Sequence, residues 1–106
     1  MLFVDIYADE GGAIDPTAEY IRTLEVYAPC CLSRMIELSV VKEQPKVPTA
    51  MLMVKELYEG GEKILDLLKK ANKEALADEE DGIANFLADR MSAHGKWCWQ
   101  LNSLMK

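Results

Sequence analysis

Long hydrophobic runs, paired CxxC cysteines and a secretory signal are all missing from this sequence. No stretch approaches the roughly 20 apolar residues that a membrane-spanning helix needs, so a membrane protein is not expected. The three cysteines are Cys30, Cys31 and Cys98, and two adjacent cysteines do not present a pair of good zinc ligands from regular structure. These thiols are therefore expected to be reduced, which predicts a cytoplasmic protein.

Basic charge is also scarce, because 12 Lys and Arg residues stand against 18 Asp and Glu residues and give a formal net charge of −6. This balance repels phosphate backbones and anionic membranes, which argues against direct DNA binding. Cations are favoured instead where carboxylates gather, as they do at Asp78, Glu79, Glu80 and Asp81. The same four residues would equally suit a helix start, because acidic side chains stabilise a helix N-terminus.

The second half of the chain carries two strong helical patterns. At 106 residues with 50% hydrophobic side chains, the chain is predicted to form one domain, 1–106. Apolar residues recur at spacings of three and four from Thr49 to Ala77, and again from about Glu79 to Leu104. The short interval between these helices predicts an antiparallel hairpin. Gly60 and Gly61 weaken the first helix, so we expect a neighbouring segment to pack closely there.

Glycine and proline punctuate the first 48 residues, which predicts shorter elements. Gly11, Gly12 and Pro16 predict a break or kink between the first two helices. The stretch from Tyr27 to Pro48 is long for a loop and is typical of a crossover within a helical bundle. The expected elements are helices near Leu2 to Glu10, Asp15 to Val26 and Cys31 to Leu38, followed by an extended connection from Ser39 to Val47.

Several runs of residues follow one known family pattern. Asp15-Pro-Thr-Ala-Glu19-Tyr-Ile-Arg22 is similar to D-x-x-A-E-R-I-R, and the segments 37–43 and 48–54 have similar counterparts. The most specific run begins at Glu80 and reads E-D-G-I-A-N-F-L-A-D-R-M-S-A-H-G-K-W-C-W-Q-L. It is similar to D-E-G-T-A-D-x-L-x-D-R-x-x-A-H-E-K-W-x-W-x-L. In order and spacing, the chain resembles the Dps miniferritins, the iron-binding starvation ferritins.

This resemblance implies an all-α, ferritin-like helical bundle that lacks the first helix and has a short helix in its long crossover connection. It also implies self-association into a homo-oligomer such as a cage, which oxidises and stores ferrous iron and protects from oxidative stress. The resemblance assigns metal-ligand roles to Asp15 and Glu19, and a possible cation pore to Asp78, Glu79, Glu80 and Asp81. Asn85 stands where the family pattern has an acidic residue, which would weaken such a pore.

The carboxylates of Asp15 and Glu19 suit iron chemically, because they are hard oxygen donors four residues apart and so share one helical face. A second interpretation is open at this point. Aspartate followed by proline is the usual order of a helix N-cap and first helical position, so the Asp15 carboxylate would then bind backbone amides instead.

Histidine is nearly absent, and the single example, His94, falls on the apolar stripe of the last helix. We therefore expect a hydrogen-bonded core residue and assign it no catalytic role. The family's first helix, which supplies histidine ligands, has no counterpart in the sequence. Two hypotheses follow: a shortened Dps-like iron oxidase, or a noncatalytic Dps-like oligomerisation protein without a ferroxidase centre. Both predict self-association, because a missing helix would leave apolar faces exposed.

Overall fold

The structure, a computed structural model, describes residues 1–106 and contains four helices and no strand. The helices are α1 (Leu2–Thr23), α2 (Leu32–Leu38), α3 (Ala50–Ala77) and α4 (Asp81–Leu104). The predicted all-α fold with a short helix in its central connection is therefore confirmed. The chain divides into two compact units, Met1–Ser39 and Val40–Lys106. None of the helices combines the length and apolar character that a bilayer span requires.

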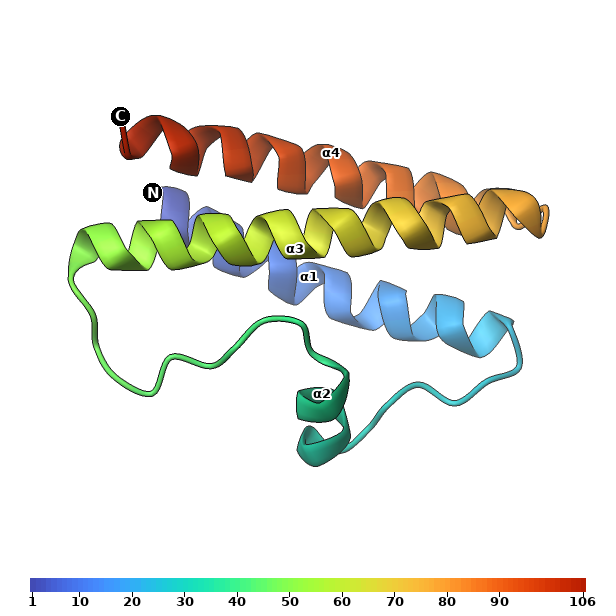
Figure 1. Ribbon diagram of the computed structural model, residues 1–106. Helices are drawn as coiled ribbons and strands as arrows, with labels where there is room; N and C mark the ends of the chain where they lie inside the picture. Colours follow the sequence, from blue (N-terminus) through green and yellow to red (C-terminus); the bar gives the residue numbers. More distant parts are fainter. The chain divides into compact units, whose positions relative to one another are not determined.

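The helices α3 and α4 form the predicted antiparallel hairpin and lie side by side along their length (Figure 1). Helix α3 begins where expected, because the Thr49 side chain accepts a hydrogen bond from the backbone N–H of Leu52 at 3.3 Å. Irregular backbone without helix or strand connects Leu38 to this cap, as predicted. The buried apolar residues of this unit are Val54 and Ala75 of α3 with Ala84, Cys98 and Leu101 of α4.

The turn between α3 and α4 is closed by two backbone hydrogen bonds. The N–H of Glu80 donates to the carbonyl of Ala75 at 2.8 Å, and the N–H of Glu79 donates to that of Leu76 at 3.2 Å. This is a Schellman motif, and it requires the left-handed backbone that Glu79 adopts, with φ of 59°. Because these residues form the turn, α4 begins at Asp81 and not at Glu79 as predicted.

Close packing at the paired glycines is confirmed, and it centres on Gly61. A methyl group at Gly61 would lie 2.8 Å from Sγ of Cys98 in α4, which is too close for an unshifted neighbour. The same group at Gly60 would meet the side chain of Val41 at an ordinary 3.5 Å. Gly61 therefore lets α4 approach α3 at the level of Cys98.

The predicted break in the N-terminal segment is wrong, because α1 runs without interruption from Leu2 to Thr23 with Pro16 inside it. Neither Gly11 nor Gly12 leaves the helical region, since no glycine has a positive φ. Proline removes one backbone donor, and the hydroxyl of Thr17 donates to the carbonyl of Ala13 at 2.6 Å in the same turn. Glycine and proline here add a propensity cost without ending the helix.

Candidate functional site

The two predicted ligands lie one helical turn apart on α1, and both side chains are exposed. Because α1 begins at Leu2 and thirteen of its residues precede Asp15, this aspartate is not the N-cap of a helix and the N-cap interpretation is wrong. Asp15 and Glu19 therefore remain as two carboxylates on one helical face, which could bind a cation together. Whether they bind a metal stays a prediction.

The donor set on the chain is small. No group of three or more His, Cys, Asp or Glu side chains among residues 1–106 is arranged to hold a metal ion. Asp15 and Glu19 bring two oxygen donors, whereas a non-haem iron site uses about three protein ligands and keeps positions open for the oxidant. The pair thus fits part of an iron site, and its remaining donors would come from beyond the two carboxylates.

His94 lies in the hairpin core, as predicted. It is 5% exposed on α4, and its Nε2 lies 3.4 Å from a guanidinium nitrogen of Arg90 one turn earlier. A neutral imidazole accepts a hydrogen bond at this nitrogen, so the arginine satisfies the buried ring. The geometry gives His94 a packing role and assigns it no part in a metal site.

The four acidic residues proposed for a pore do not share one structural role. Asp78 is the C-cap of α3, Glu79 forms the left-handed turn, Glu80 is the N-cap of α4, and Asp81 begins α4. Stabilisation of a helix start accounts for Glu80 and Asp81 only, because a carboxylate near a helix C-terminus opposes the helix dipole. All four side chains are exposed, which leaves a concentrated negative charge at the end of the hairpin.

Two hollows along α3 were not predicted from the sequence, because they depend on which side chains meet in the fold. One, of about 300 Å³, contains Glu56, whose Oε1 accepts a hydrogen bond from Nε2 of Gln44 at 2.8 Å. The other, of about 530 Å³, is lined by the exposed lysines Lys69, Lys70 and Lys73 together with Asp66, Asn72 and Met91. Neither contains a group of side chains suited to hold iron.

The cysteines occupy contrasting environments. Cys30 and Cys31 are exposed at the start of α2, whereas Cys98 is buried between α3 and α4. The Ser33 hydroxyl, followed by the backbone N–H of Arg34, lowers the pKa of the Cys31 thiol from its ordinary value of 9.0. Burial, followed by the carboxylate of Glu62, raises the pKa of the Cys98 thiol.

Four helices without strands, a long antiparallel hairpin and a short helix in the central connection define an all-α, ferritin-like bundle. The chain matches the ferritin-like domain family over residues 1–106 and belongs to that family. Within it the chain is Dps-like, because solved Dps proteins share its fold at a TM-score of 0.93. This fold is that of a general iron-storage family.

Three solved structures give this comparison. Dps from Staphylococcus aureus is 25% identical, and the match covers 98% of this chain and 70% of that one. A Dps protein from Bacillus brevis is 22% identical with the same coverage. The Dps protein of Vibrio cholerae O1, described as a member of a superfamily of ferritin-like diiron-carboxylate proteins, is 24% identical, with 98% and 65% covered.

Two cyanobacterial proteins are similar in sequence. An uncharacterized low temperature-induced protein of Nostoc sp. and its homologue in Anabaena variabilis are each 30% identical over 95 residues. The match covers 88% of this chain and 53% of each relative. The chain therefore spans about half the length of the curated relatives it matches.

Proposed function

We propose that this chain is a Dps-like iron-binding protein that takes ferrous iron as its substrate, oxidises it and stores the product, protecting the cell from oxidative stress. The observation that carries this proposal is the position of Asp15 and Glu19. They lie one turn apart on an uninterrupted helix, both are exposed, and the sequence around them resembles the Dps ligand segment.

The two carboxylates would bind the ferrous ion and stabilise the higher charge that oxidation produces. Each ferrous ion gives one electron to an oxidant of the dioxygen or peroxide class. Hard oxygen ligands favour the ferric product, because its greater charge attracts carboxylates more strongly. Asp15 and Glu19 would thus act both in binding and in favouring oxidation.

Self-association is part of the proposal, since two carboxylates need further donors. Large apolar side chains are exposed in both units, such as Tyr7 at 82% and Ile14 at 66% on α1, and Trp99 at 66% on α4. Exposed apolar surface of this kind favours association with further chains. A homo-oligomer would supply additional donors to each pair, and light scattering that shows a monomer at micromolar concentration would contradict this part.

In such an oligomer the acidic turn at Asp78, Glu79, Glu80 and Asp81 would attract cations. If symmetry brought the acidic turns of several subunits together, the electrostatic potential between them would become more negative. A more negative potential raises the local concentration of cations. The proposed role is therefore a cation pore that serves the iron site.

A noncatalytic oligomerisation protein is the second candidate. It is favoured by the burial of His94 in the hairpin and by the pairing of its ring with Arg90, which leave the imidazole without a metal-binding role. In this alternative the exposed apolar side chains still mediate assembly, but Asp15 and Glu19 are only hydrated surface residues of α1 and bind no metal.

Aerobic oxidation of ferrous iron distinguishes the two candidates. The wild-type protein should oxidise iron above the buffer rate, and an Asp15→Ala, Glu19→Ala double variant should lose about tenfold or more of that excess, because both protein ligands are gone. The matched control is Glu56→Ala, Glu59→Ala, which removes the same charge one turn apart on α3 and should retain the wild-type rate. Equal rates for wild type and the α1 variant would support the noncatalytic candidate.

A further inference from the structure

Cys30 and Cys31 form an exposed vicinal dithiol that the iron proposal does not use. They lie directly before α2, in the connection between the long helices, and both are free thiols exposed to solvent. Two reactive groups adjacent in the chain remain close in any arrangement of the two units. The pair therefore has both the access and the proximity that reversible thiol oxidation requires.

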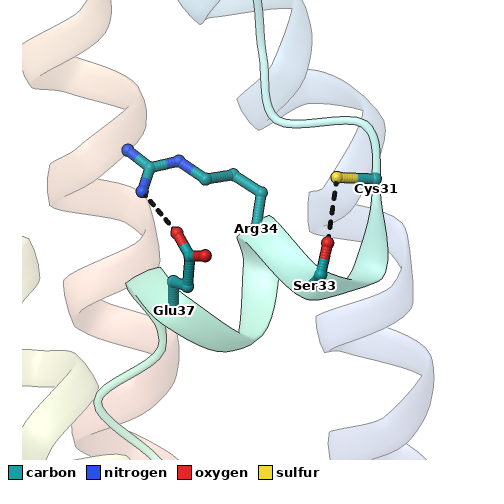
Figure 2. Close-up of polar contacts among 4 residues, drawn as sticks. All are labelled: Cys31, Ser33, Arg34 and Glu37. Carbon is teal, nitrogen blue, oxygen red and sulfur yellow. Dashed lines mark hydrogen bonds and ion pairs between the residues drawn. The ribbon is translucent and has the colours of Figure 1, made fainter.

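The environment of Cys31 distinguishes it from its neighbour. Its Sγ lies 3.5 Å from Oγ of Ser33, and Figure 2 shows both side chains on the same side of the turn that enters α2. A hydroxyl donates to a thiolate, and the backbone N–H of Arg34 adds a second donor. Both donors stabilise the ionised form and lower the pKa of the thiol.

The guanidinium of Arg34 does not supply this stabilisation. Its Nη1 lies 2.9 Å from Oε2 of Glu37, one turn along α2, so its charge is paired there (Figure 2). The hydroxyl of Ser33 is therefore the side chain that sets Cys31 apart. Cys30 has no corresponding contact, although it too is exposed.

We propose that Cys30 and Cys31 are a reversible oxidation site for peroxides, in which Cys31 is the nucleophile and Cys30 resolves the product. The Cys31 thiolate attacks one peroxide oxygen, the O–O bond breaks, and Cys31 becomes a sulfenic acid while hydroxide or alkoxide leaves. The Cys30 thiol then attacks the sulfenic sulfur, a disulfide forms and water leaves. The two sulfurs give up two electrons, and these reduce the peroxide.

The resulting disulfide is expected to be reduced easily. Adjacent Cα atoms are about 3.8 Å apart, whereas unstrained disulfides have Cα separations of about 4.4 Å or more. The strain raises the reduction potential, so a small thiol such as glutathione should restore the pair. Reversal of this kind distinguishes a regulatory site from oxidative damage.

Site-specific kinetics test the assignment of roles. The reduced protein is treated with iodoacetamide at pH 7, and the labelling of each cysteine is followed by mass spectrometry of its peptide. Cys31 should react about two- to fivefold faster than Cys30, and the buried Cys98 should react slowest. A Ser33→Ala variant should slow Cys31 toward the rate of Cys30, because the larger of its two donors is removed, and should leave Cys98 unchanged. Equal rates for Cys30 and Cys31 in the wild type would overturn the assignment.

Stoichiometric hydrogen peroxide tests the product. Wild-type protein and a Cys98→Ser control should each lose two hydrogens from the peptide that contains both cysteines, and glutathione should reverse this. A Cys30→Ser variant should instead accumulate a sulfenic acid at Cys31 that dimedone traps, because the resolving thiol is missing. A disulfide-linked dimer, or no disulfide at all in the wild type, would contradict resolution by the adjacent cysteine.

Discussion

The hairpin of α3 and α4 buries residues from both of its helices, whereas α1 and α2 contain no buried residue. The stability of the hairpin therefore comes from packing inside its own unit. The helices of the Met1–Ser39 unit depend more on local terms, such as backbone hydrogen bonds and helix propensity. The exposed carboxylates proposed to bind iron and the exposed thiols both belong to this N-terminal unit. The comparison teaches that structural constraint and chemical access are concentrated in different parts of the chain.

The thiols show the same contrast in a single residue type. Cys98 of α4 is buried against α3 at Gly61, and the pKa of its thiol is raised. Cys31 lies directly before α2 and is exposed, and the pKa of its thiol is lowered. A buried thiol behaves as a small apolar side chain, and an exposed thiol with hydrogen-bond donors behaves as a nucleophile.

The largest effect is expected from the hairpin core. Replacing Leu101, which is 2% exposed, with alanine should lower the free energy of unfolding by about 2–5 kcal/mol, because it leaves a cavity between packed side chains. The matched control is Leu104→Ala, one turn later on α4 at a side chain that is 53% exposed. Urea unfolding should show a clearly smaller loss for this control. Equal losses would remove the basis for calling the hairpin a packed unit.

The next effect concerns the close approach of the two hairpin helices. Gly61→Ala should lower the free energy of unfolding by about 1–3 kcal/mol, because the added methyl group would meet Sγ of Cys98. Combining it with Cys98→Ala should recover part of the loss in a double-mutant cycle. The adjacent Gly60→Ala has room for its methyl group and should be neutral or stabilising. A neutral Gly61→Ala would contradict the close contact.

A smaller effect of opposite sign is expected in the N-terminal unit. Gly11 lies inside α1 with open space around it, so Gly11→Ala should stabilise that helix by about 0.5–1 kcal/mol through helix propensity alone. Amide hydrogen exchange in α1 should become slower in this variant, while exchange in α4 stays unchanged. If amides around residue 11 exchange faster than those in the rest of α1, the helix is broken there, as the sequence patterns alone predicted.

The smallest effect is a difference in alkaline stability. Folding raises the pKa of the Cys98 thiol above its ordinary value of 9.0. The thiol's contribution to the free energy of unfolding is therefore fully present below pH 9.0 and is lost as the pH rises through the folded-state pKa. Urea unfolding above pH 9.0 should therefore show a steeper decline for wild type than for Cys98→Ala. A Cys98→Ala curve parallel to wild type would contradict the linkage.

The hairpin could be predicted closely from the sequence, while the N-terminal helix could not. Regular apolar spacing and the Thr49 cap located α3 and α4 to within two residues, because periodicity reports directly on a buried face. In α1 the costs of Gly11, Gly12 and Pro16 suggested a boundary, but the helix continues through all three, with only the backbone donor of Pro16 missing. Helix propensity gives the free-energy cost of placing a residue in a helix, but it does not determine whether the helix continues through that residue.

The candidate site divides in a similar way. The spacing of Asp15 and Glu19 could be read from the sequence, and the continuity of α1 then removed the N-cap alternative for Asp15. The contact of Cys31 with Ser33 was missed, although a cysteine two residues before a serine at the start of a helix was a usable signal. The hollow beside Glu56 could not be predicted, because Gln44 reaches it across 12 residues of chain.

The C-terminal ends of α1 and α3 each contain a backbone conformation that lowers the stability of the chain. Glu25 and Glu79 follow the last residues of these helices with φ of 63° and 59°, a backbone conformation that costs a non-glycine residue about 1–2 kcal/mol. Their negative charge also lies at the end of the helix where it is electrostatically unfavourable. Glycine would relieve both penalties at either position. At Glu25 the added stability leaves the hairpin core and every proposed cation-binding carboxylate unchanged, whereas at Glu79 it also removes one carboxylate of the proposed pore.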